Sequence, residues 1–171
     1  CRVKRMPALW ALAIFLVALA PRLYFFSRIE YVPTSDFVNF YNIGVAFTQG
    51  NFAEIAKVSA DYHISSFSGL GVLNGLIMTV FGTDVRSFQL VQCVITSLSS
   101  VMVYLIARRL DEGSAPAAGL LFALYPANIL FSQVTSNQHL GVFLSLTAIL
   151  FMLLALSSER RVRAGVFSAL S

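Results

Sequence analysis

The longest run of the sequence without a charged side chain sets the strongest limit on the fold. From Gly113 to Ser158, 46 successive positions hold no Asp, Glu, Lys or Arg. A helix needs about 20 apolar residues to cross a bilayer, and in that form it satisfies its own backbone hydrogen bonds. The run is long enough for two crossings, and the polar cluster from Ser132 to His139 marks the turn between them. It predicts membrane spans over 114–131 and 140–156, the first kinked at Pro126.

Further apolar windows predict more crossings. One covers residues 7–27, with Arg22 near its outer end, where a long side chain can reach the headgroups. The alternative for this window is a cleaved signal peptide with the small-residue site Ala18-Leu19-Ala20. A second window covers 87–107, and a last span begins near residue 164, after three arginines. We expect the chain to be the N-terminal part of a larger protein.

Composition agrees with a membrane protein. The chain is 57% hydrophobic and only 12% charged, whereas soluble domains are about 25% charged. The net charge of +4 comes from basic residues scattered between apolar runs, so they form no stripe for a nucleic acid. Cys93 lies inside an apolar run, as a small buried residue would. The predicted fold class is all-α: a single polytopic membrane domain over residues 1–171, a transmembrane helical bundle with juxtamembrane interfacial helices.

The placement of basic residues predicts the topology. The apolar stretch 62–83 is long enough to cross, but a crossing there would move the arginines at 108–109 and 160–163 to the outside. Without it, eight basic residues lie on the cytoplasmic side, as the positive-inside bias requires. Residues 28–84, with five of the eight acids, are therefore expected to form one extracytoplasmic loop. The N-terminus is expected to be cytoplasmic.

The loop carries two helical patterns. Thr34, Ser35 and Asp36 offer N-cap chemistry, aromatic residues follow at helical spacing, and Gly50-Asn51 is a stop signal. This pattern predicts an interfacial helix over about 36–49. A second apolar stripe predicts another over about 67–82.

Asp36 is the most informative side chain in the sequence. As a carboxylate at the start of a helix it can act as a cap. It can equally be a general base for an acceptor held at the membrane surface. Soluble nucleotide chemistry has no support, because the sequence contains no Gly-x-Gly-x-x-Gly, Walker loop, His-Glu-x-x-His or Cys-x-x-Cys.

An ordered set of short motifs runs through the chain. It comprises the span ending in Arg22, Ser35-Asp36-Phe37-x-x-Phe40-Tyr41-x-x-Gly44-x-Ala46-x-x-x-Gly50-Asn51, Phe81-Gly82, Arg86, Tyr104–Leu110, Ala117–Pro126 and Phe131-Ser132. This order resembles the N-terminal part of the integral-membrane GT-C glycosyltransferases. It looks most like the branch of protein O-mannosyltransferases and lipid A aminoarabinose transferases.

The resemblance implies a membrane enzyme of the cell envelope that transfers a sugar from a polyprenyl-phosphate carrier, with inversion, to an acceptor on the extracytoplasmic side. It matches Asp36 to the carboxylate of the first loop, which is the proposed catalytic base or acceptor-binding group of the family. Arg22, Arg28 and Lys57 are then the candidate partners of the departing phosphate, with a headgroup anchor as the alternative for each. The lipid bilayer and the lipid-linked donor are the implied partners. The acceptor is unknown, and the fragment alone is expected to be inactive.

Two stretches depart from the family pattern. Many members carry a second acid at the outer turn where this chain has Asn137 and Gln138, and a proline opens the second loop helix where this chain has none. We expect Asn137, Gln138 and His139 to line the outer cavity as substrate-binding residues, with an interface anchor as the alternative for His139. His63 has no partner at ligand spacing, so a polar loop residue is the simpler interpretation. A divalent metal is possible in the family, but no ligand can be assigned.

A non-catalytic membrane module, such as a transporter half or an assembly subunit, is the alternative function. A transporter is expected to bury ionisable or helix-breaking residues in mid-span. In this sequence the predicted mid-span residues are apolar or small and polar. That pattern favours the enzyme.

Overall fold

The computed structural model describes residues 6–30, 32–33, 36–61, 67–134 and 137–169. Within these ranges it describes all side chains except those at 6, 36, 67–70, 137 and 158–169. The described residues form helices and connecting turns without strands, which confirms the predicted all-α class. The helices are α1 (Met6–Arg28), α2 (Asp36–Thr48), α3 (Phe52–Asp61), α4 (Phe67–Phe81), α5 (Val85–Leu110), α6 (Ala115–Ala123), α7 (Pro126–Phe131) and α8 (Asn137–Ala169).

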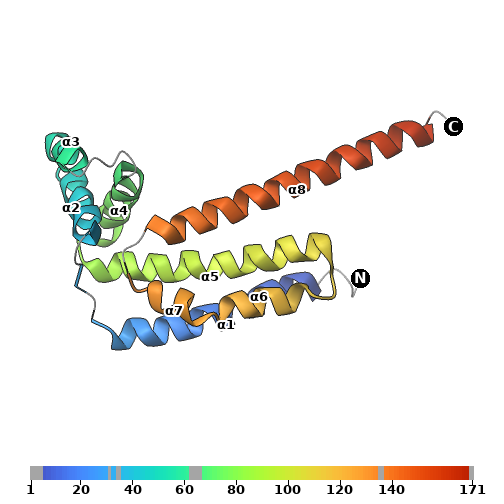
Figure 1. Ribbon diagram of the computed structural model, residues 1–171, viewed down its shortest axis with the longest axis horizontal. Coiled ribbons are helices and arrows are strands. Elements are labelled where there is room, and N and C mark those ends of the chain that lie inside the picture. The colour runs from blue at the N-terminus through green and yellow to red at the C-terminus, as the bar shows by residue number, and fades with distance from the viewer. Residues whose placement is uncertain (1–5, 31, 34–35, 62–66, 135–136, 170–171) are drawn as a thin grey trace.

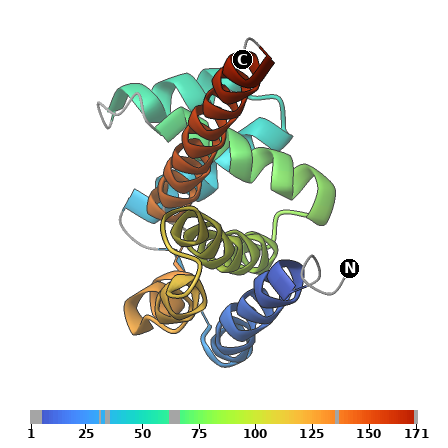
Figure 2. The ribbon, with the colours of Figure 1, turned by 90° about the vertical axis from the view of Figure 1, so that its right-hand side faces the viewer.

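Two groups of helices make up the molecule (Figure 1). Helices α1, α5 and α6 lie side by side along the long axis, and Figure 2 shows the same bundle from its end. Helices α2, α3 and α4 gather at the end where α1 stops and α5 starts, and they run across the bundle axis. Helix α8 begins beside this group, packs on α5 and then diverges from it.

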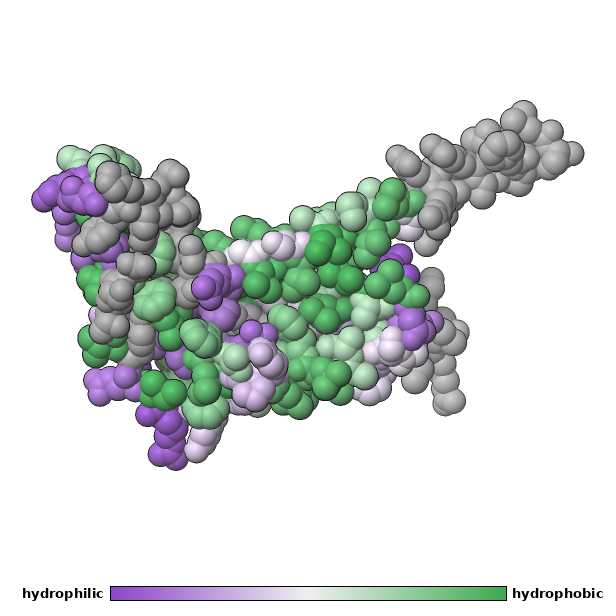
Figure 3. All heavy atoms as spheres, in the orientation of Figure 1, coloured by the Kyte–Doolittle hydropathy of each residue, from purple (hydrophilic) through white to green (hydrophobic). Residues whose placement is uncertain are grey.

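Three of the described helices are long and apolar enough to cross a membrane. These candidate spans are Pro7–Arg28, Val85–Leu110 and Gln138–Ser157. Figure 3 shows apolar surface along the middle of the visible face, with hydrophilic residues gathered toward its two ends. That distribution is the one a bilayer requires, because the charged residues then lie at the headgroup levels.

The predicted span 114–131 is not one helix. Helix α6 ends at Ala123, and α7 begins at Pro126 after an extended Tyr125 with φ −63° and ψ 116°. The ring of a proline excludes the helical conformation from the preceding residue, so Pro126 forces Tyr125 out of the helix. The sequence predicted a kink at this proline; the structure has a complete break.

Helix α8 also differs from its prediction. We expected a span over 140–156, a basic turn, and a new span from residue 164. The structure has one continuous helix of 33 residues from Asn137 to Ala169. Arginine is a good helix former, and no proline interrupts residues 157–164. The basic residues therefore do not end the helix, which at about 50 Å is longer than a bilayer core of about 30 Å.

The segment between α1 and α5 contains three helices where the sequence predicted two. Helix α3 was missed because Gly50-Asn51 was interpreted only as a stop. Gly50 has a left-handed φ of 66°, and the side chain of Asn51 accepts a hydrogen bond from the backbone N–H of Glu54 at 3.2 Å. Asn51 thus acts as the N-cap of the next helix.

Two buried hydrophobic clusters stabilise the packing of the helices. Phe40, Ile43, Ile77 and Phe88 form the first, between α2, α4 and α5. Ile14, Ala18, Tyr104, Ala115 and Ala123 form the second, between α1, α5 and α6. Glycines allow the close approach of α2 and α4: a methyl group added at Gly75 would lie 2.5 Å from the ring of Phe47.

Candidate functional site

Asp36 is the first residue of α2, and its side chain lies outside the described part of the structure. The position of its helix is fixed by α4. The buried Asn74 donates from Nδ2 to the carbonyl oxygen of Phe40 at 3.1 Å, one turn beyond Asp36. Burial of Phe40 and Ile43 anchors the same turns of α2. The hydrogen bond from Asn74 and the burial of Phe40 and Ile43 therefore fix the helix whose first residue is Asp36.

The start of α8 meets the same cluster. Leu140 packs against the group formed by Phe40, Ile43, Ile77 and Phe88. Leu140 lies one turn into α8, and Phe40 lies one turn into α2. The first turns of the two helices, which begin at Asn137 and Asp36, thus pack on a common hydrophobic cluster although they are about 100 residues apart in sequence.

A hollow of about 610 Å³ lies between the end of α1 and the start of α5. Its lining includes two cations, Arg28 and Arg86, and two carboxylates, Glu30 and Asp84. We call it the α1–α5 hollow. Asp84 has a structural role: its side chain accepts a hydrogen bond from the backbone N–H of Arg86 at 2.9 Å and caps α5.

Aromatic residues of α1 hold the two guanidinium groups of the α1–α5 hollow. The Arg86 guanidinium lies 5.2 Å from the ring centroid of Phe26 and donates from Nη2 to the Phe26 carbonyl oxygen at 3.2 Å. Arg28 lies over the ring of Tyr24 at 5.8 Å. Within the described ranges, neither arginine forms an ion pair. Both cations can therefore face an anion in the hollow.

Arg22 was predicted to reach the headgroups, and this prediction is wrong. Its side chain is fully buried. Nε donates to the Thr96 hydroxyl at 3.0 Å, and Nη1 donates to the carbonyl oxygens of Ala18 and Ala123, the latter at 3.0 Å. Ala123 ends α6, and the break at Pro126 leaves its carbonyl without the usual partner four residues on. Arg22 supplies that missing donor.

Two glutamines extend this buried network, and sequence reasoning did not single them out. Gln133 donates from Nε2 to the Arg22 carbonyl oxygen at 3.1 Å, and Gln89 donates to the Gln133 carbonyl oxygen at 2.7 Å. Together they tie the segment between α7 and α8 to α1 and α5. For Gln89 the available signal was its position, because an amide inside an apolar run must find a partner away from water. Gln133 gave no such signal, because it belongs to the polar cluster that was interpreted as a turn.

The three predicted substrate-binding residues do not share one environment in the structure. The side chain of Asn137 lies outside the described part, and Gln138 is exposed. His139 is buried, and it lines a cavity of about 90 Å³ with Thr96, Ser99 and Asn128. Its Nε2 atom has no hydrogen-bond partner among the described residues. His139 therefore faces a small cavity inside the bundle, on the α5 side of α8, that Phe122 and Val142 also line.

No metal site can be built from the described residues. They contain no group of three or more His, Cys, Asp or Glu side chains close enough to share an ion. His63 lies outside the described residues. The described residues therefore supply no ligand set for the divalent metal that the resemblance left open.

The long apolar helices and the buried intramembrane network define an integral membrane protein with an all-helical fold. The family model for dolichyl-phosphate-mannose-protein mannosyltransferases matches residues 70–171, more than half of the chain. The chain belongs to this family of membrane glycosyltransferases, in agreement with the resemblance to the GT-C enzymes. No curated protein and no solved structure matches the chain.

The family favours an enzyme over the transporter or assembly subunit considered as the alternative. The match begins within α4, so it includes α5 to α8 but not Asp36. It covers the Arg86 side of the α1–α5 hollow but not Arg28.

Proposed function

We propose that the chain is part of a glycosyltransferase that moves a sugar from a polyprenyl-phosphate carrier to an acceptor on the extracytoplasmic side of the membrane. The observation that carries the proposal is the shared cluster beneath the first turns of α2 and α8. It brings Asp36 and the Asn137–His139 segment to the same end of the bundle. Because the family transfers sugars, we assign catalysis and sugar binding to those polar residues.

Asp36 is proposed as the general base. Its carboxylate takes the proton of the acceptor hydroxyl or amide while the acceptor atom attacks the anomeric carbon of the sugar. The bond from that carbon to the phosphate oxygen breaks, and the polyprenyl phosphate leaves with the electron pair. Attack from the face opposite the phosphate inverts the configuration at the anomeric carbon. Asn137 and Gln138 offer hydrogen bonds to the sugar hydroxyls.

Charge on the departing phosphate requires cations, and the structure changes which ones we propose. Arg22 is buried among backbone carbonyls and cannot serve. Arg28 and Arg86 line the α1–α5 hollow at the end of the bundle where α2 lies. Preorganised guanidinium groups stabilise a developing phosphate charge more than water does. We propose this pair as the phosphate-facing group; Lys57, exposed on α3, stays a headgroup anchor.

The proposal is tested with the full-length protein and a polyprenyl-phosphate sugar donor. Asp36→Asn removes the base but keeps the size of the side chain, so turnover should fall by about 10²–10⁴-fold with little change in KM. Asp61→Asn is the matched control, because Asp61 is exposed at the end of α3. Turnover in Asp36→Asn equal to that of the control would remove Asp36 from the mechanism.

A further inference from the structure

A wedge-shaped cavity of about 320 Å³ opens between α5 and α8. It lies toward the end of the bundle opposite α2, α3 and α4, where α8 diverges from α5 (Figure 1). Its lining combines apolar and charged residues: Leu105, Arg108, Arg109, Glu112, Leu150 and Leu154. We call this cavity the α5–α8 wedge. The family match and the proposed sugar transfer assign no role to it.

The lining changes from apolar to charged along the bundle. Leu105 precedes Arg109 by four residues, so the two share a face of α5, and Leu150 and Leu154 share a face of α8 in the same way. The arginines lie in the last turn of α5, which has 26 residues and a length of about 39 Å. A helix of that length places its last turn at the level of the lipid headgroups. The wedge thus has leucine walls on the bilayer side and guanidinium groups at its rim.

The two guanidinium groups are available to an anion. Arg108 pairs with Glu112 at 3.2 Å, but the Glu112 side chain is 80% exposed, and water and salt screen an exposed pair so that it contributes little. Arg109 is exposed and forms no ion pair within the described ranges. A phosphate can therefore bind Arg109 and share Arg108 with little loss.

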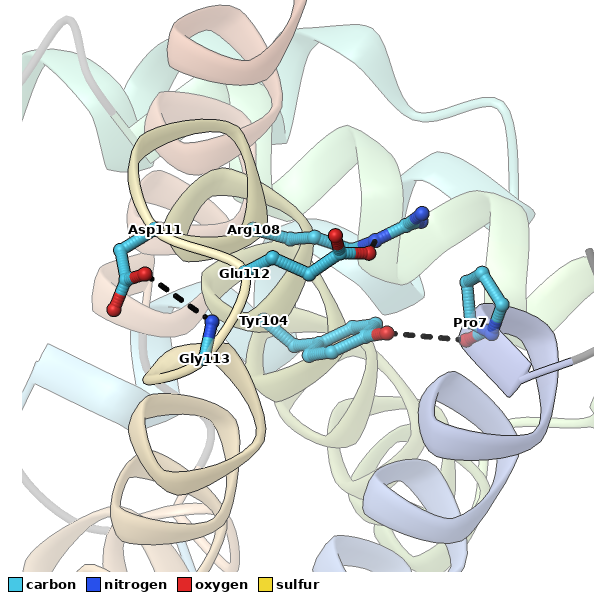
Figure 4. A network of polar contacts seen from close by, with 6 residues as sticks. All are labelled: Pro7, Tyr104, Arg108, Asp111, Glu112 and Gly113. Carbon is cyan, nitrogen blue, oxygen red and sulfur yellow. Dashed lines mark hydrogen bonds and ion pairs between the residues drawn. The ribbon is translucent and has the colours of Figure 1, made fainter. Parts of the chain in front are cut away.

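The other nearby carboxylate does not compete. Figure 4 shows Asp111 directed toward Gly113, away from the Arg108–Glu112 pair. Hydrogen bonds from the Ser114 side chain and from the backbone N–H groups of Gly113 and Ser114 hold the pKa of Asp111 below its ordinary value. Its carboxylate accepts from those N–H groups at 3.2 and 3.0 Å. Asp111 thus stays ionised as part of the turn between α5 and α6.

We propose that the α5–α8 wedge binds one anionic phospholipid. Its phosphate lies between Arg108 and Arg109, and an acyl chain lies against Leu105, Leu150 and Leu154. An anionic headgroup with an apolar tail complements both parts of the lining, and basic pockets between membrane helices bind such lipids. A zwitterionic lipid fits less well, because its ammonium group would meet the same cations. A further helix in the wedge would have to bring its own carboxylates to the two arginines.

The test uses the full-length protein, stripped of lipid, in mixed micelles with either phosphatidylglycerol or phosphatidylcholine. Phosphatidylglycerol should raise the midpoint of thermal unfolding, whereas phosphatidylcholine and inorganic phosphate should not, because binding needs both the charge and the chain. Arg109→Gln should weaken the apparent lipid affinity by about fivefold, since a surface cation contributes about 1 kcal/mol. Glu112→Gln removes the carboxylate that competes for Arg108, so it should increase the apparent lipid affinity.

Lys57→Gln is the control, because it removes an exposed cation on α3, at the opposite end of the bundle. Equal loss of affinity in Lys57→Gln and Arg109→Gln would overturn the proposal, as would equal stabilisation by the two lipids. A phosphatidylglycerol with a photoreactive acyl chain should crosslink to peptides of α5 and α8 that include Leu105 or Leu150. Crosslinks only elsewhere, or no stabilisation by either lipid, would also overturn the proposal. None of these measurements depends on sugar transfer, so they fail or succeed independently of the proposed function.

Discussion

Arg22 shows how one buried side chain can join several helices. Its guanidinium reaches Thr96 on α5 and Ala123 on α6, and its own carbonyl oxygen accepts from Gln133. The guanidinium fork has five donors in fixed directions, so it can bond a hydroxyl and two carbonyls at once. The sequence placed Arg22 near the end of a span but could not show that α6 ends beside it. The interpretation as a headgroup anchor failed for that reason.

Replacement of Arg22 by lysine tests this role. A lysine keeps the charge, but its single ammonium cannot span Thr96 and Ala123 together, so at least one buried oxygen loses its donor. We expect Arg22→Lys to lower the free energy of unfolding by about 1–3 kcal/mol. Reversible unfolding of the full-length protein in mixed micelles measures the change. Arg28→Lys, on an exposed arginine, should change it by less than about 0.5 kcal/mol; the same loss in both variants would contradict the role given to Arg22.

The sequence predicts which helices exist better than it predicts where each helix ends. Helices α1, α2, α4 and α5 lie within a few residues of their predicted ranges, because apolar periodicity and caps are local signals. Helix α3 was missed because its N-cap also ends α2. The length of α8 was underestimated because charge marks the bilayer surface and not the end of a helix.

The candidate site was predictable only in part. Asp36 and the Asn137–His139 segment stand out in sequence as polar groups beside spans. Their common cluster involves Phe40 and Leu140, which ordinary apolar periodicity cannot pair across 100 residues. The burial of His139 was also hidden, because it depends on how α8 meets Thr96 and Asn128.

The contact between α2 and α4 gives a prediction at this scale. A methyl group at Gly75 would lie 2.5–2.6 Å from atoms of Phe47, so one of the helices must shift. We expect Gly75→Ala to destabilise the protein by about 1–3 kcal/mol. Gly141→Ala is the control, because no atom lies within 4 Å of its added methyl group, and alanine favours a helix. Thermal unfolding of the two variants side by side measures the difference; equal midpoints would contradict the close packing of α2 on α4.

For the whole molecule, the arrangement of helices supports the proposed topology. Helix α1 ends and α5 begins at the end that carries α2, α3 and α4, and α5 ends at the opposite end. A bilayer around the long helices would separate Gln49 from Gly113. The proposed topology has Gly113, which follows Arg108 and Arg109, on the cytoplasmic side, as the positive-inside bias favours.

Cysteine labelling of intact cells checks this topology. A membrane-impermeant maleimide should label Gln49→Cys and leave Gly113→Cys unlabelled until the cells are opened. Both variants are made in a chain with Cys1 replaced by serine. Cys93 is buried and gives little background. Labelling of Gly113→Cys from outside would show that the topology beyond α1 is the reverse of the proposed one. The α5–α8 wedge would then lie in the outer leaflet.

The break between α6 and α7 has a consequence for how the protein is made. These helices have nine and six residues, about 14 and 9 Å, and neither can cross a bilayer of about 30 Å alone. At the break, the carbonyl oxygen of Ala123 accepts from the guanidinium of Arg22, and without that donor it would be costly in lipid. This segment can therefore settle in the membrane only after α1 and α5 have met and Arg22 is in place to receive it. Biogenesis should thus be ordered, with the two long helices acting as a template for the broken one.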